Sequence, residues 1–296
     1  NLGTFKDCGL AVLNTVISNN TAEDSLNGHA EGGGIRISED GGQAWIINCR
    51  IVNNRAVGPR NYNAGGGLYV NYATALTVRN TLIAGNEARD NGGGAWVALG
   101  TAFENCTIAG NVSDGKGSGL LLRTQSYSPY GCRVENSIVF SNYSLYSGSW
   151  RDDVYLVENT SNWFDHVVVG NRSNDPPLPG TAIVYGADPR FLNGALEAWR
   201  LSRYSPCINA GTNRPWMIGA RDLDRVARLL NGIVDLGCYE TDPAGVSMAC
   251  FMTAPPDNQV FGAPAAIPFQ AMGYALKPTM VTQMVVYADT APIATG

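Results

Sequence analysis

A nine-residue phrase that returns every 25 to 34 residues is the feature that most constrains the fold of this chain. A full copy opens with Asn, places Ile or Val three residues later and closes with a second Asn. The copies are NTVISNNTA from Asn14, NCRIVNNRA from Asn48, NTLIAGNEA from Asn80, NCTIAGNVS from Asn105, NSIVFSNYS from Asn136 and, more loosely, DHVVVGNRS from Asp165. Alternation over so few residues favours strands, and a repeat of this period is typical of stacked, repetitive folds.

Two positions of each copy are predicted to point inward. The first is Thr15, Cys49, Thr81, Cys106, Ser137 and His166, and the second is Ile17, Ile51, Ile83, Ile108, Val139 and Val168. Burying one such apolar side chain contributes about 1.5–3 kcal/mol, which is too little for an isolated strand, so the copies must stack. The closing Asn suits a turn with unusual backbone angles, and its amide can bond the copies above and below.

A second element follows each variable loop. It reads GGGIRI, GGGLYV, GGGAWV and GSGLLL, and ends at Ile37, Val70, Val97 and Leu122. Glycines turn a corner and a short alternating strand follows. Strand, Asn turn, loop, Gly corner and strand make one coil of a parallel β-helix, so the predicted fold class is an all-β solenoid of about six rungs.

The Asn phrase with its following GGG resembles the repeats of right-handed parallel β-helix surface proteins, including the polymorphic outer-membrane type. The segment DPRFLNGALEAWRLSRYSPCINAGTN from Asp188, with RDLDRVARLLNGIVDLGCYE from Arg221, resembles the choice-of-anchor Q ending of bacterial secreted β-helix proteins. This resemblance implies a bacterial protein that is secreted or sits on the cell surface. Arg225 stands where that family often has Gly, which argues against a calcium loop at Asp222 and Asp224.

Three regions are predicted along the chain. Residues 1–187 form the rungs, residues 188–240 close the β-helix, and residues 241–296 hold a linker and the beginning of an immunoglobulin-like sandwich. Because the last region has about half the length of such a sandwich, we expect the parent protein to continue. The chain opens on Asn1 rather than Met, so we expect a fragment or a mature form.

Composition excludes several classes of partner and cofactor. The net charge of −5, with only three Lys, argues against nucleic acid. No run reaches the roughly 18 apolar residues of a membrane span. With two His and no CxxC pair, no metal site is expected. Phosphate loops and dinucleotide motifs are missing too, so no cofactor is expected.

Parallel β-helices include polysaccharide lyases and glycoside hydrolases, so an active site is possible in such a fold. The candidates are Asp152 and Asp153, beside Arg151, because glycoside hydrolysis uses two carboxylates about 5–10 Å apart. Adjacent residues of a strand point to opposite faces, however, and a solvated loop or an ion pair with Arg151 explains them as well. His166, in the predicted inward column, is more simply a core residue than a base.

Two surfaces are candidates for contact with other molecules. The first is an outward stripe after the Gly corners, formed by Arg36, Tyr69, Trp96 and Leu121 and flanked by Tyr72; it could stack on sugar rings, or the chain's own loops could cover it. The second is an apolar face that a solvent-exposed sheet should not have. A loop, the rest of the protein or another copy must cover it; we expect assembly through Val52, Leu82, Ala84, Ile138, Phe140, Val167 and Val169.

The function expected from the sequence is that of an extracellular structural or adhesive protein, which takes part in assembly by self-association or contact with other surface proteins, or in contact with a glycan. The alternative is a polysaccharide lyase or glycoside hydrolase, and a glycan-binding module of a larger enzyme lies between the two.

Overall fold

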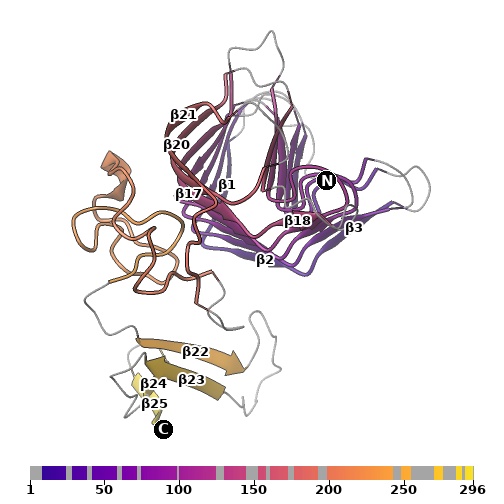
Figure 1. Cartoon of the computed structure of the whole chain (residues 1–296). Helices are drawn as coiled ribbons and strands as arrows, with labels where there is room; N and C mark the ends of the chain where they lie inside the picture. The colour runs from indigo at the N-terminus through magenta and orange to yellow at the C-terminus, as the bar shows by residue number, and fades with distance from the viewer. Residues whose placement is uncertain are drawn as a thin grey trace.

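A computed structural model describes most of the chain. The described residues are 9–24, 29–38, 42–58, 62–71, 75–98, 100–124, 130–144, 153–157, 161–172, 177–192 and 199–242, with the backbone of four further strands between 248 and 295. They form an all-β structure in which parallel strands coil around a single interior (Figure 1).

Three parallel sheets make the walls of the solenoid. The largest joins two columns that share a long strand, β17. The first column is β1 (Leu10–Leu13), β5 (Gln43–Ile47), β9 (Ala75–Arg79), β13 (Thr101–Glu104), β17 (Arg133–Phe140), β20 (Trp163–Val169) and β21 (Gly180–Tyr185); the second is β2 (Val16–Ser18), β6 (Arg50–Val52), β10 (Leu82–Ala84), β14 (Thr107–Ala109) and again β17.

The two smaller sheets follow the Asn turn and the Gly corner. After the turn come β3 (Thr21–Glu23), β7 (Arg55–Val57), β11 (Glu87–Ala88), β15 (Val112–Ser113) and β18 (Tyr143–Ser144). After the corner come β4 (Ile35–Ser38), β8 (Leu68–Asn71), β12 (Ala95–Ala98), β16 (Leu120–Arg123) and β19 (Val154–Val157). The register follows the repeat, with Ile51, Ile83 and Ile108 directly above one another.

The left-handed backbone angles fall on the opening Asn of each copy and not on the closing one. The opening residues Asn14, Asn48, Asn80, Asn105 and Asn136 have φ between 47° and 56°. Asn is one of the few residues that tolerates this region, which explains its recurrence where the two columns of the large sheet meet. The unusual angles predicted at the closing Asn belong instead to the residue before it, such as Gly85 or Gly110.

The closing Asn residues form the amide ladder that the repeat predicts. The backbone N–H and the Nδ2 of Asn54 both donate to Oδ1 of Asn86, at 2.9 and 3.0 Å. The same pair of bonds links every step through Asn20, Asn54, Asn86, Asn111 and Asn142. Because each amide has the same orientation, the ladder ends on a residue that still needs an acceptor. This acceptor is Asp153, whose Oδ1 lies 2.8 Å from the N–H and 2.6 Å from the Nδ2 of Asn142.

The inward columns are confirmed for the copies from Asn48 to Asn136, and the last copy is shifted by one residue. Ser137 pairs with Val167 and Val139 with Val169, so both of these valines point into the core, where they are fully buried. His166 therefore takes the corner position of an opening Asn, with φ 53°, and not the inward position predicted for it. Val168 points outward, where it packs with Ile138, so the predicted faces of His166, Val167, Val168 and Val169 are all corrected.

The region after residue 188 covers the flank of the solenoid rather than its end (Figure 1). Leu201, Cys207 and Leu236 pack on Ile138 and Val168, and Cys238 and Tyr239 pack on Leu82 and Ala84. Its backbone also bonds the corner asparagines: the Nδ2 atoms of Asn80, Asn105 and Asn136 donate to the carbonyls of Arg221, Asp235 and Thr212.

This cover corrects the predicted assembly face. Leu82, Ala84 and Ile138 are buried under the chain's own closing region, and Val52 and Phe140 pack partly against the same clusters. Val167 and Val169 lie inside the core. The apolar face exists as predicted, but the described residues bury it within one chain.

The C-terminal part contains two antiparallel strand pairs. β22 (Met248–Ala254) pairs with β23 (Gln270–Ala275), and β24 (Val285–Ala288) pairs with β25 (Ala291–Thr295). The presence of strands agrees with the β-structure predicted for this region, and the immunoglobulin-like sandwich stays a prediction.

Candidate functional site

The predicted aromatic stripe is present in register, but most of its side chains are buried. Arg36, Tyr69, Trp96 and Leu121 stack on successive rungs, and Tyr155 continues the column. The rings of Tyr69 and Trp96 stack at 4.7 Å, and their residues are only 5% and 9% exposed. Leu121 is buried as well. Tyr69 and Trp96 therefore present no open aromatic face to a sugar ring, and Tyr72 lies outside the described residues.

The predicted catalytic carboxylate Asp153 is a structural residue. It is fully buried, it accepts the last bonds of the Asn ladder, and its Oδ2 accepts the N–H of Asn171 at 2.7 Å. Asp152 and Arg151 lie outside the described residues. A carboxylate whose oxygens are committed to backbone and amide donors in the core is not placed to reach a substrate, so this part of the enzyme hypothesis loses its support.

An exposed polar and aromatic surface lies instead on the outer face of β17 and β20. Arg133 and Trp163 are register partners there, and Glu135 and Asp165 follow two residues further along the same strands. Because side chains two residues apart share a face of a strand, these four side chains form two adjacent rows on the outer face.

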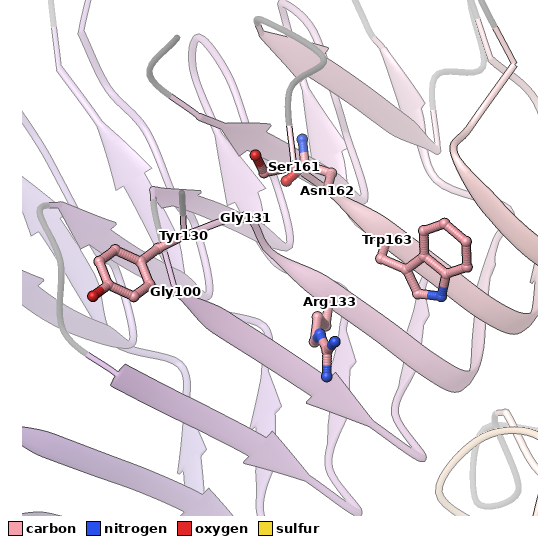
Figure 2. Close-up of a pocket in the computed structure, with 7 residues that line it drawn as sticks. All are labelled: Gly100, Tyr130, Gly131, Arg133, Ser161, Asn162 and Trp163. Carbon is pink, nitrogen blue, oxygen red and sulfur yellow. The ribbon is translucent and has the colours of Figure 1, made fainter. Parts of the chain in front are cut away.

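The first row opens onto a pocket of about 400 Å³. Its lining residues are Gly100, Tyr130, Gly131, Arg133, Ser161, Asn162 and Trp163. Figure 2 shows Tyr130 and Trp163 at opposite ends, with Arg133 on one side between them and Asn162 on the other. Tyr130 is 64% and Trp163 43% exposed, whereas Tyr69 and Trp96 of the aromatic stripe are buried.

Local backbone geometry shapes this pocket. Any side chain at position 131 would collide with the carbonyl oxygen of Ser161, so Gly131 lets two neighbouring coils approach closely. The next residue, Cys132, donates its N–H to Oδ1 of Asn162 at 2.9 Å. This bond fixes the orientation of a side-chain amide that is only 3% exposed, and leaves its Nδ2 without a partner among the described residues.

The second row is a network of ion pairs. Nη2 of Arg214, from the closing region, lies 2.9 Å from a carboxylate oxygen of Glu135 and 2.9 Å from one of Asp165. Asp165 also contacts Nδ1 of His166 at 2.8 Å and accepts the hydroxyl of Thr181 at 2.7 Å. Burial acts to raise the pKa of Asp165, but the hydrogen bonds from Thr181 and His166 and the charge of Arg214 outweigh it, so its pKa is lowered.

These two carboxylates could be taken for a glycosidase pair, since both oxygens contact one nitrogen and so lie within twice 2.9 Å of each other. Such a pair needs one carboxyl that holds a proton at neutral pH. Here the same guanidinium binds both groups, and the pKa of Asp165 is lowered rather than raised. The arrangement suits a fixed polar surface better than acid catalysis.

A model of the right-handed β-helix region family matches residues 5–161, more than half of the chain. This chain is a right-handed β-helix protein. No curated protein and no solved structure matches it significantly. Among the described residues, none of the helices has the length and apolar character needed to cross a bilayer.

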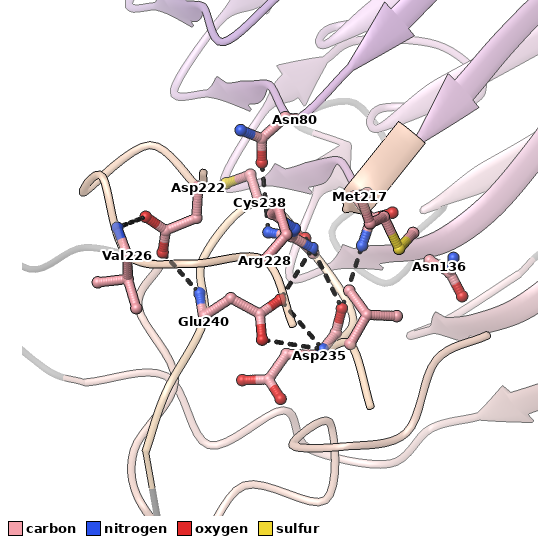
Figure 3. Close-up of polar contacts among 12 residues, drawn as sticks. Asn80, Asn136, Met217, Asp222, Val226, Arg228, Asp235, Cys238 and Glu240 are labelled. Atoms are coloured by element: carbon pink, nitrogen blue, oxygen red, sulfur yellow. Dashed lines mark hydrogen bonds and ion pairs between the residues drawn. The ribbon is translucent and has the colours of Figure 1, made fainter. Parts of the chain in front are cut away.

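The closing region of this β-helix protein contains a second charged cluster, which is buried (Figure 3). Arg228 is fully buried and contacts Glu240 at 3.2 Å. Asp235 accepts the N–H groups of Asn209 and Thr241, and Asp222 accepts those of Asp224, Val226 and Glu240. These are acids of the RDLD and IVDLGCYE phrases, and their bonds to the backbone of the same region give them a structural role.

The cluster makes the closing region sensitive to pH. Burial raises the pKa of Asp235 to about 6 and that of Glu240 to about 9, although Arg228 opposes both shifts. Because the folded state favours the protonated acids, their contribution to stability is complete below about pH 4 and is lost as the pH rises through 6 and then 9. We expect the free energy of unfolding to fall between pH 5 and pH 9, and Glu240→Gln to flatten the upper part of this fall.

Urea unfolding at several pH values measures the effect. Glu87→Gln is the matched control, since Glu87 pairs with Arg55 on the solenoid surface. A pH dependence of Glu240→Gln identical to that of the unmodified chain and of Glu87→Gln would contradict the role given to Glu240.

Sequence reasoning missed the surface on β17 and β20 because it followed the repeat. Tyr130 and Arg133 precede an Asn phrase and Trp163 precedes its loosest copy, so they fall outside the aligned positions. An available signal was the period-2 pattern of RVEN and WFDH, in which Arg133, Glu135, Trp163 and Asp165 all take the outward phase.

Proposed function

We propose that this β-helix protein is an extracellular or cell-surface adhesive protein that contacts glycans through the face of β17 and β20. The observation that carries the proposal is the pocket between the exposed rings of Tyr130 and Trp163. Open aromatic rings stack on the apolar faces of sugars, and a pocket of this size is within the usual range for small ligands. Family membership is compatible with surface proteins, adhesins and polysaccharide-acting enzymes alike.

Two features favour binding over chemistry. The acids beside the pocket, Glu135 and Asp165, form ion pairs with Arg214. Asp153 accepts the last hydrogen bonds of the Asn ladder. The family alone does not decide between an adhesin and an enzyme, since one fold hosts many functions. A polysaccharide lyase or glycoside hydrolase remains the alternative, and it would have to use other groups.

A glycan array followed by product analysis tests the proposal. We expect the protein to retain at least one class of glycan and to leave its chain length unchanged after prolonged incubation. Shortened products or unsaturated ends would favour the enzyme alternative, and binding to no glycan would overturn the proposal.

Self-association, the other expected role, has a different surface available. Among the described strands, β21 pairs only with β20, and Val184 and Tyr185 on it are each 47% exposed. An unpaired edge strand with exposed apolar side chains can pair with another chain. We propose that the protein self-associates through β21, which would pair with a second copy; a monomeric mass in solution at high concentration would exclude this.

A further inference from the structure

Two polar side chains that line the pocket can only donate hydrogen bonds. The guanidinium of Arg133 is exposed and makes no hydrogen bond or ion pair with any described residue. Trp163 offers its indole N–H, and the hydroxyls of Tyr130 and Ser161 can donate or accept. No carboxylate belongs to the lining. A ligand that brings acceptors therefore fits this pocket.

Arg133 is the strongest indication of a ligand. It is exposed on the outer face of β17 beside Trp163, and no described residue pairs with its charge. The Nδ2 of Asn162 also lacks a partner among the described residues, but this atom is buried, so a ligand in the pocket does not reach it. An anion supplied from outside would pair with the guanidinium of Arg133.

We propose that the pocket binds the anionic substituent of an acidic sugar residue, a carboxylate or a sulfate, at the guanidinium of Arg133. This inference rests on the proposed glycan contact and names its substrate class. The planar guanidinium matches the two oxygens of a carboxylate or sulfate, and a hydrogen bond between charged groups is stronger than a neutral one. Trp163, the register partner of Arg133, places a ring for the sugar beside the charge.

The surrounding charges allow an anion at this place. Glu135 and Asp165 lie in the next row along the same strands, about 7 Å away for residues two apart on a strand. Arg214 lies 2.9 Å from each and offsets one of their two negative charges. The pair therefore repels a ligand anion less than two free carboxylates would, and the guanidinium of Arg133 stays available to it.

Matched sets of oligosaccharides test the proposal. Each set presents one backbone in three forms, with a hydroxyl, a carboxylate or a sulfate at C6, on gluco, galacto and manno backbones. The intact protein should bind at least one acidic form tenfold or more tightly than its neutral form, and the carboxylate and sulfate arms show which anion is preferred.

Two variants assign this preference to the pocket. Arg133→Gln removes the charge of an exposed side chain, and Arg133→Glu reverses it. Each should weaken binding of the acidic form by about tenfold to a hundredfold, with little effect on the neutral form. Arg123→Gln, an exposed arginine on β16, is the matched control and should bind like the unmodified chain.

The outcomes separate this inference from the proposed function. Equal binding of neutral and acidic forms, lost on Trp163→Ala, would overturn the anion site and leave the glycan contact standing. A preference for acidic forms that Arg133→Gln does not reduce would place the anion elsewhere and overturn the inference as well. Binding to no member of any set would overturn both.

Discussion

Replacing Asp153 by Ala should lower the free energy of unfolding by roughly 3–5 kcal/mol, because two buried donors and one part-buried donor lose their acceptor together. These are the N–H and Nδ2 of Asn142 and the N–H of Asn171, all within 2.8 Å of a carboxylate oxygen. Asp153 itself is fully buried, so the two donors of Asn142 lose their acceptor inside the core.

Asp153→Asn is the matched variant for this prediction. Its amide keeps one oxygen for Asn142 and turns a donor toward Asn171, so we expect a loss of about 1–2 kcal/mol. Urea unfolding followed by circular dichroism measures both. If Asp153→Ala lost less than about 1 kcal/mol, the ladder would not depend on its last acceptor and Asp153 would again be a candidate for catalysis.

Replacing Arg228 by Met should destabilise the closing region by about 3–5 kcal/mol, since removal of one partner from a buried charge cluster leaves the others without compensation. Arg228 bonds the carbonyl of Gly237 at 3.0 Å, Oδ1 of Asn80 at 3.2 Å and Glu240 at 3.2 Å. It therefore links the closing region to a rung of the solenoid as well as to its acids.

The second substitution Glu240→Leu should restore part of this loss, because it removes the acid that Arg228→Met leaves unpaired. Hydrogen exchange of the backbone between residues 219 and 241 locates the effect. Uniform exchange changes over all rungs, or a double variant no more stable than Arg228→Met, would contradict a local role for the pair.

The repeat predicts the solenoid well because the sequence of each rung contains the residues that its own structure requires. Asn at each corner, Ile or Val inside and Asn in the ladder are local requirements, so the register from Asn48 to Asn136 follows from the sequence. The slip in the last copy has a physical cause. His166 takes the corner in place of Asn. Val167, Val168 and Val169 are equally apolar, so the sequence does not show which of them point inward.

Features outside the repeat could not be predicted in this way. The cover of Leu82 and Ile138 comes from residues more than 60 positions later, with no period that links them. Asp153 serves the ladder from the place where the other coils have their Gly corner, and Tyr155 extends the aromatic column in this coil without a Gly corner. The apolar flank was evident from the sequence, but only the structure shows that the same chain covers it.

Binding of a retained glycan to Trp163→Ala, beside Tyr204→Ala, tests the proposed function most directly. Both positions carry exposed aromatic rings, at 43% and 66%, but only Trp163 lines the pocket. A stacked ring of this kind contributes about 1.4 kcal/mol, which corresponds to a tenfold change in affinity. We expect Trp163→Ala to lose about tenfold in calorimetric affinity while Tyr204→Ala binds like the unmodified chain; equal affinities for all three proteins would contradict a glycan contact on β17 and β20.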